Sequence, residues 1–243
     1  MPEKVPPVLK SAKQDRQNLQ SFFNIAVSVD CVIFGYDKNE LFVLLRESEL
    51  EEFQGLYSLM GDLVRPNEDL TEASYRILFE RTGLQHVYME QVHTFGKVDR
   101  HPTGRVITTA YFCLINMQHQ GLNIAGRDID WYPVRKMKQL AFDHMEILQL
   151  CIQQLQQRVM ERPIIFHLLP PLFSLRELQA VYEAILGVEL DRRNFRKKIA
   201  LKDWITDTHT MERQVSHRPG KLYSFNHERY SQMRKKIFVG IDF

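Results

Sequence analysis

The acidic side chains between residues 59 and 84 are spaced like those of a site that cleaves diphosphates with the help of divalent cations. Such cleavage needs cations to neutralise the phosphates and to activate a water molecule. Magnesium takes several oxygen ligands, and carboxylates at helix positions i, i+3 and i+4 share one face and can supply them. Here those positions hold Ile77, Glu80 and Arg81. We expect Ile77 in the core and the Arg81 cation to repel a metal, so hydrolysis is lost and a pocket remains.

This segment resembles the Nudix box, a family pattern written G-x5-E-x7-R-E-U-x-E-E-x-G-U, where U is aliphatic. Upstream, Gly55-x-Tyr57-x-Leu59 resembles the G-x-W-x-L that leads into the box. Asp62 occupies the first position of the pattern, and the residues in register with it are Glu68, Arg76, Leu78, Glu80, Gly83 and Leu84. The resemblance covers about residues 22–150 and implies a Nudix-like α/β/α sandwich.

One departure from the box bears on the ligand. Asp62 stands where the pattern has a glycine, and glycines let backbone approach a pyrophosphate closely. The departure therefore favours a small neutral ligand over a diphosphate. Two simpler alternatives stay open: Arg76 and Glu80, four residues apart, pair on a helix surface, and Glu68 is a solvated acid.

A polar loop at residues 96–105 supplies a second group of candidate ligand contacts. It places Asp99, Arg100 and Arg105 among turn residues, between two predicted strands. Arginine forks suit the recognition of phosphates or vicinal diols. The alternative is a solvated turn with an internal ion pair.

The start of a long predicted helix adds Asp143 and His144, for which the alternatives are a helix cap and a structural histidine. We expect no catalytic residue, no metal ligand and no cofactor. The predicted effector-binding side chains are all polar or charged: Asn24, Arg46, Asp62, Glu68, Glu80, Asp99, Arg100, Arg105, Asp143 and His144.

The elements that position these side chains follow from residue type and period. Runs rich in Val, Ile and Phe predict strands at residues 24–34, 41–45, 87–95 and 106–115. Helical spacing of apolar residues predicts helices at residues 67–84 and 143–160, the first ended by Gly83. The first two strands form a hairpin, and the alternation of strands with helices predicts α/β packing.

Residues 173–200 have the pattern of a helix-turn-helix. Ser174 and Glu177 form a capping box, Gly187 breaks the first helix, and Asp191 can cap a second. The second helix opens with a basic and polar run: Arg192, Arg193, Asn194, Arg196, Lys197 and Lys198. At a recognition helix arginine suits guanine, asparagine suits adenine and later lysines suit phosphates. The alternative is a basic face that is only solvated.

Two further strands, at residues 204–208 and 217–225, are expected to form a wing. Arg218 and Lys221 would then reach a phosphate or the minor groove. The two strands after the helix pair complete the pattern of a winged helix that binds DNA.

The two parts together resemble the NrtR family of Nudix-related transcriptional regulators. Among the matching stretches are Leu140-Ala-Phe-Asp-His144 and Leu190-Asp-Arg-Arg-Asn-Phe-Arg196. The resemblance implies a Nudix effector sensor and a winged helix that binds operator DNA as a homodimer. Some members sense ADP-ribose, and others sense sugars. The chain looks most like the arabinose-responsive AraR branch, so we expect a sugar such as L-arabinose first, an ADP-ribose-like effector second, and control of carbohydrate catabolism.

Composition and charge restrict the remaining classes. With 44% hydrophobic and 26% charged residues, the chain is ordinary for a globular protein and contains no membrane-spanning stretch. It begins without a signal region, and the scattered Cys31, Cys113 and Cys151 predict buried thiols in a reducing cytoplasm. Residues 151–243 carry a net charge of +6 and residues 1–150 of −4, which favours a polyanionic partner for the basic end.

The predicted organisation is an arm at residues 1–20, an effector-binding domain at 21–160 and a DNA-binding domain at 161–243. Two other functions stay open. An active Nudix hydrolase of nucleoside diphosphate derivatives, with a basic accessory domain, would need carboxylates from outside the box. An RNA-binding module would need exposed aromatics for stacking, and the basic helix carries only Phe195, which its spacing places inward.

Overall fold

The computed structural model describes residues 24–37, 39–117, 128–213 and 218–239, so the arm expected at residues 1–20 lies outside the described residues. The strands are β1 (Ala26–Asp37), β2 (Glu40–Glu47), β3 (Tyr57–Ser58), β4 (Met60–Leu63), β5 (Tyr88–Phe95), β6 (Val106–Asn116), β7 (Ile129–Pro133), β8 (Phe173–Ser174), β9 (Ile205–Met211) and β10 (Lys221–Phe225). The α-helices are α2 (Leu70–Thr82), α3 (His144–Glu161), α4 (Leu175–Leu186), α5 (Arg192–Ala200) and α6 (His227–Val239). Short 3-10 helices are η1 (Glu51–Phe53), η2 (Val134–Lys136) and η3 (Pro163–Leu168).

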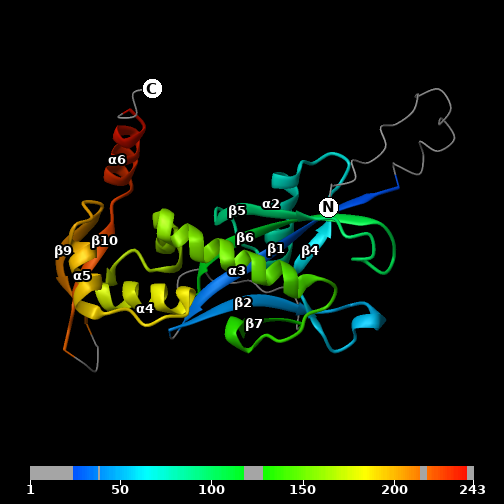
Figure 1. Ribbon diagram of the computed structural model, residues 1–243, viewed down its shortest axis with the longest axis horizontal. Helices are drawn as coiled ribbons and strands as arrows, with labels where there is room; N and C mark the ends of the chain where they lie inside the picture. The colour runs from blue at the N-terminus through cyan, green and yellow to red at the C-terminus, as the bar shows by residue number, and fades with distance from the viewer. Residues whose placement is uncertain (1–23, 38, 118–127, 214–217, 240–243) are drawn as a thin grey trace, which may run out of the picture.

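The first part of the chain is a mixed sheet with a helix on each face (Figure 1). Among the described residues the strand order is β3-β2-β1-β6-β5, with β4 paired to β1 and β7 to β2. The two-residue alternation of β1 divides its side chains between the faces. Cys31 and Ile33 pack with α2, whereas Val32 and Phe34 pack with α3. The α/β/α sandwich expected from the sequence is confirmed.

Both helices of the sandwich begin and end near the positions that the sequence predicts. A capping box between Asp69 and Glu72 starts α2, and Gly83 ends it with a left-handed φ of 72°. The apolar stripe of α3 contains Ile147, Leu148, Cys151, Leu155 and Val159, all of them buried. Helical spacing therefore located both helices to within a turn.

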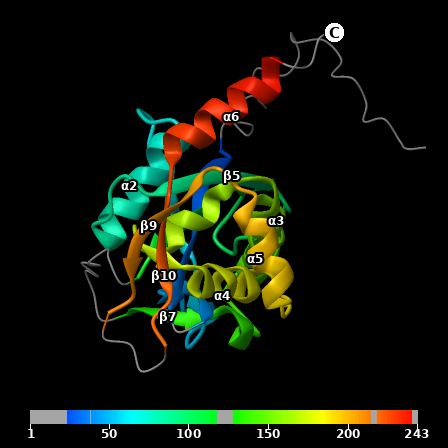
Figure 2. The same ribbon diagram turned by 90° about the vertical axis from the view of Figure 1, so that its left-hand side faces the viewer.

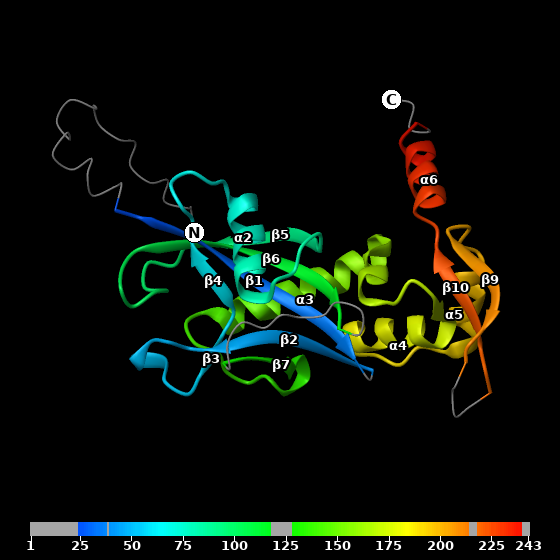
Figure 3. The same ribbon diagram turned by 180° about the vertical axis from the view of Figure 1, so that it is seen from behind.

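The second part of the chain has the helix-turn-helix and wing of the predicted DNA-binding domain (Figure 2). The predicted capping box of Ser174 and Glu177 starts α4, Gly187 ends it with a φ of 70°, and Asp191 caps α5. The strands form a sheet of order β8-β10-β9. Beyond the wing, α6 projects from the end of β10 (Figure 3), and Tyr230 in its first turns contacts Phe225 of β10 and Trp204. No helix was predicted there from the sequence.

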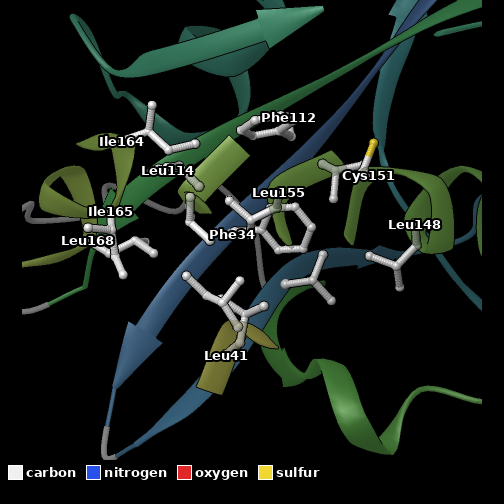
Figure 4. Close-up of a cluster of buried hydrophobic side chains, with 14 of the residues drawn as sticks. Phe34, Leu41, Phe112, Leu114, Leu148, Cys151, Leu155, Ile164, Ile165 and Leu168 are labelled. Atoms are coloured by element: carbon white, nitrogen blue, oxygen red, sulfur yellow. The ribbon is translucent and has the colours of Figure 1, made fainter. Parts of the chain in front are cut away.

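One apolar cluster joins the two parts. Leu155 of α3 and Phe34 of β1 pack in the same cluster as Leu168 of η3 and Val181 of α4, and Figure 4 shows the contribution of η3 to it. Polar contacts reinforce the junction: the Gln156 side chain donates a hydrogen bond of 3.0 Å to the Ile185 carbonyl. The winged helix is therefore packed against the sandwich and not tethered by a linker alone.

The three cysteines are free and buried, as expected. Burial raises the pKa of each thiol well above its usual range, so these groups stay protonated and unreactive at neutral pH. No helix of the described chain is long and apolar enough to cross a lipid bilayer.

Candidate functional site

A cavity of about 500 Å³ opens on the α3 side of β1. β2 pairs with β1 only as far as Leu44, opposite Ile33, and β4 pairs with the preceding part of β1. The strands thus diverge, and alternate β1 residues line the resulting space. Ser28 and Asp30 face the cavity, whereas Phe34, further along the same face, lies in the core.

Arg100 lies at the buried end of the cavity in a network of charges. Its Nε and Nη2 donate hydrogen bonds of 2.9 and 2.7 Å to the two carboxylate oxygens of Asp143. Its Nη2 also lies 3.4 Å from Oδ2 of Asp30. The Arg100 side chain is 3% exposed, so this part of the 96–105 loop is not a solvated turn. Asp143 occupies the N-cap position of α3, but its side chain makes no capping hydrogen bond and instead holds Arg100.

His144 completes the buried end. Its Nδ1 accepts a hydrogen bond of 3.0 Å from the backbone N–H of Leu59, and its Nε2 lies 3.6 Å from Oδ1 of Asp30. Burial lowers the pKa of His144 below its usual range. The neutral ring therefore carries its proton on Nε2, facing the Asp30 carboxylate. His144 lines the cavity, and its bond to Leu59 joins the residue between β3 and β4 to the start of α3.

The residues in register with the box form an ion-pair cluster around Arg76. The Arg76 guanidinium lies 2.7 Å from a carboxylate oxygen of Glu68, 3.1 Å from Glu80 and 3.4 Å from Asp62. Arg65 lies 3.0 Å from the other oxygen of Glu80. The hydrogen bonds from Arg76 lower the pKa of Glu68 to about 2. The helix pair of Arg76 with Glu80 is confirmed, and the interpretation of Glu68 as a solvated acid is wrong.

These residues do not fit the magnesium cluster that a Nudix box normally binds. Ile77 is 1% exposed and packs in the core, as expected. Glu80 is already bound by two guanidinium groups. Within the described ranges, no three His, Cys, Asp or Glu side chains are grouped as metal ligands would be.

The structure brings six of the predicted effector residues to the cavity and places four elsewhere. The six that line it are Asn24, Arg46, Asp62, Arg100, Arg105 and His144. Glu68 and Glu80 belong to the Arg76 cluster, Asp143 lies behind Arg100, and Asp99 is exposed on the loop. Sequence reasoning missed Asp30, although a buried acid in an otherwise apolar strand is a signal that could have found it.

The second candidate surface is the exposed face of α5. All six basic or polar residues predicted there are exposed: Arg192, Arg193, Asn194, Arg196, Lys197 and Lys198. Phe195 and Ile199 point the other way and pack on the core, as expected. In the wing, Arg218 is exposed, but the Lys221 ammonium pairs with Asp207 at 2.7 Å. The wing tip at residues 214–217 lies outside the described residues.

Two domain families match the chain. Residues 24–151 match the NUDIX domain, and residues 165–225 match the NrtR DNA-binding winged helix domain. The two matched segments correspond to the sandwich and to the helix-turn-helix with its wing. The first contains the cavity, and the second contains the exposed face of α5.

Two relatives match across both parts of the chain, and a third matches about half of it. The chain is 31% identical over 204 residues to the ADPR responsive transcriptional repressor NtrR of Acinetobacter baylyi, across 82% of this chain and 81% of that protein. It is similar to the crystal structure of Shewanella oneidensis NrtR complexed with a 27mer DNA, with 30% identity, a TM-score of 0.72, and coverage of 84% of this chain and 95% of that one. An ADP-ribose pyrophosphatase of Methanocaldococcus jannaschii is 26% identical across 56% of this chain and 79% of its own length.

Proposed function

The chain belongs to the NrtR family, and we propose that it is a transcriptional regulator that binds operator DNA and responds to ADP-ribose. The observation that carries the proposal is a Nudix domain with a cavity of about 500 Å³, whose wall includes charged side chains, but with its box acids bound by arginines. Such a domain holds a ligand without cutting it. The Acinetobacter relative, whose name describes a repressor responsive to ADPR, supports the choice of effector.

The DNA contact is assigned to α5. Its exposed N-terminal turn carries Arg192, Arg193 and Asn194, which suit base edges in the major groove. Lys197 and Lys198, further along the helix, suit contacts to the phosphates of the DNA backbone. We propose a homodimer, because two winged helices related by a two-fold axis match a palindromic operator. Light scattering on the purified chain measures this directly, and a monomer at operator-binding concentrations would contradict it.

The helix α3 connects the effector cavity with the DNA-binding part of the chain. α3 begins beside the cavity, where Asp143 holds Arg100, and Gln156 near its other end bonds the Ile185 carbonyl of α4. A ligand shifts the balance between two arrangements only through its difference in affinity for them. We infer that ADP-ribose acts by favouring one placement of α3, and with it of α4.

The expected likeness to the arabinose-responsive branch is not supported by the comparisons, because the regulator relative described above is named for ADPR. Control of carbohydrate catabolism loses its support for the same reason. The expectation of a small neutral ligand, which was based on Asp62 in place of a glycine, is also weakened. Asp62 lies at the exposed rim of the cavity and pairs with Arg76. L-arabinose therefore becomes the comparison ligand of the test.

A thermal-shift titration tests the effector. A ligand that binds only the folded chain stabilises it by about 2.7 kcal/mol at one hundred times its Kd. We expect a concentration-dependent rise in Tm with ADP-ribose and none with L-arabinose or ribose. A rise with L-arabinose alone would overturn the effector assignment while leaving the regulator intact.

Duplex binding tests the regulator. Duplexes selected from a random pool by the full chain are measured by fluorescence anisotropy with and without ADP-ribose. We expect a palindromic preference, a steep salt dependence and an affinity that changes with ADP-ribose. Magnesium-dependent turnover of ADP-ribose that disappears in Glu80→Gln would instead establish the hydrolase alternative.

A further inference from the structure

Arg46 is a buried cation in the cavity wall with an unused hydrogen-bond donor. Its side chain is 9% exposed, and it lines the cavity. Its Nε has no hydrogen-bond partner among the described residues. The partner found for its guanidinium there is the carboxylate of Glu49, three residues further on, whose side chain is 72% exposed.

This arrangement is unfavourable as a purely structural ion pair. A guanidinium carries five N–H donors, and removing it from water is costly unless those donors are satisfied. The exposed Glu49 carboxylate engages Nη2 and leaves the buried Nε without an acceptor. An oxyanion that took the place of Glu49 could accept from Nη2 and, after a small rotation of the guanidinium, from Nε as well, in the planar fork that arginine offers to phosphates and carboxylates.

The other two arginines that line the cavity already donate hydrogen bonds to protein acceptors. Asp143 binds Arg100 through two hydrogen bonds, and Asp30 lies beside it. Nη1 of Arg105 donates a hydrogen bond of 2.8 Å to the Lys97 carbonyl. Among the described cations that line the cavity, Arg46 is the one with a buried nitrogen that lacks a hydrogen-bond partner.

We propose that Arg46 is the subsite for an anionic group of the effector, and that Glu49 is an internal competitor which must leave Arg46 when that group binds. The proposal rests on the assignment of this cavity as the effector site, and for ADP-ribose the anionic group is its diphosphate. Glu49 lies at the surface just before η1, so its side chain can turn into solvent without moving β2.

The exchange predicts opposite effects of two neutralising substitutions. Glu49 also lines the cavity, and Glu49→Gln removes its competing charge while keeping a side chain of nearly the same size. ADP-ribose should therefore bind about three- to tenfold more tightly, a gain of roughly 0.7 to 1.4 kcal/mol. Arg46→Met removes the anchor and should weaken binding by more than about tenfold. Glu51→Gln is the matched control, because Glu51 is an exposed acid of the same segment that does not line the cavity.

Calorimetric titration of the full chain tests the proposal with ADP-ribose and inorganic pyrophosphate as probes. Arg46→Lys, which keeps the charge but loses the fork, accompanies Arg46→Met, and the thermal midpoint of each variant confirms that it is folded. We expect both probes to bind more weakly to the Arg46 variants and more tightly to Glu49→Gln, with Glu51→Gln unchanged.

The outcomes separate this inference from the effector assignment. Wild-type affinity for ADP-ribose in both Arg46 variants, or no gain in Glu49→Gln, overturns the inference and leaves the ADP-ribose assignment standing. Pyrophosphate binding that depends on Arg46, in a chain that ignores ADP-ribose, supports the anionic subsite and removes the effector assignment. No binding of either probe to the wild-type chain overturns both.

Discussion

Replacing Asp143 with alanine should destabilise the fold through the charge it leaves behind. Asp143 accepts two hydrogen bonds from Arg100, whose side chain is 3% exposed. Removing one partner of a buried ion pair typically costs about 3–5 kcal/mol, because the other charge stays buried without compensation. Asp30, 3.4 Å from the same guanidinium, remains as a partial partner, so we expect the low end of that range, about 3 kcal/mol. No capping hydrogen bond is lost, since the Asp143 side chain makes none.

Urea unfolding followed by circular dichroism measures this cost, with an unchanged m-value as the sign that only stability has changed. Asp99→Ala is the matched control: Asp99 is an exposed acid of the same loop as Arg100 and should cost less than about 0.5 kcal/mol. Combining Asp143→Ala with Arg100→Met should recover part of the loss, because the unpaired cation is gone. A loss below about 1 kcal/mol for Asp143→Ala, or no recovery in the double variant, would refute the reasoning.

Three further predictions concern the cavity and the DNA-binding helix. A Cβ at Gly61 would lie 2.1 Å from Oδ1 of Asp30, so Gly61→Ala should cost about 1–3 kcal/mol in urea unfolding and weaken effector binding in the thermal-shift titration. Burial lowers the pKa of His144 below its ordinary 6.5. As the pH falls, His144 therefore becomes protonated in the unfolded chain before it does so in the folded chain. Stability should therefore fall as pH drops below 6.5, by up to about 1.4 kcal/mol per pH unit from this group, and urea midpoints for His144→Gln should show a shallower slope. Lys197→Ala should lower the slope of log affinity against log salt by about 0.9 in anisotropy titrations on the selected duplex, and an unchanged slope would remove Lys197 from the phosphate contacts.

The parts of the fold that local rules govern could be predicted from the sequence. Gly83 and Gly187 end their helices in the left-handed conformation, and Ser174 and Asp191 cap theirs, because each of these effects acts within a few residues. The helix α6 was missed because its sequence has a weak apolar stripe among many charges, so the periodicity that identified α3 gave little signal there.

The candidate site was predicted less well because its contacts join distant segments. Arg100 meets Asp30 across 70 residues of sequence and Asp143 across 43, and no local pattern reports such pairs. Arg100 and Asp143 were both candidates from the sequence, and the structure places Arg100 in the cavity wall with Asp143 bound to it. The sequence analysis did not show that Asp143 lies behind Arg100, nor that the acid facing the cavity beside it is Asp30.

The arginine cluster explains how the box can persist in recognisable form without a metal. The sequence analysis expected Arg81 to be the cation that repels magnesium, whereas the cations that bind Glu80 are Arg65 and Arg76. Glu68 accepts from both the backbone of Arg65 and the side chain of Arg76, so the same residues fasten the β4–α2 loop to α2. A magnesium ion seated on Glu80 would have to displace those guanidinium groups and break that attachment. The acids and the arginine that make the box recognisable thus have a structural role here that does not depend on catalysis. For this reason the motif alone is weak evidence for catalysis, and the contacts that its residues make are the better guide.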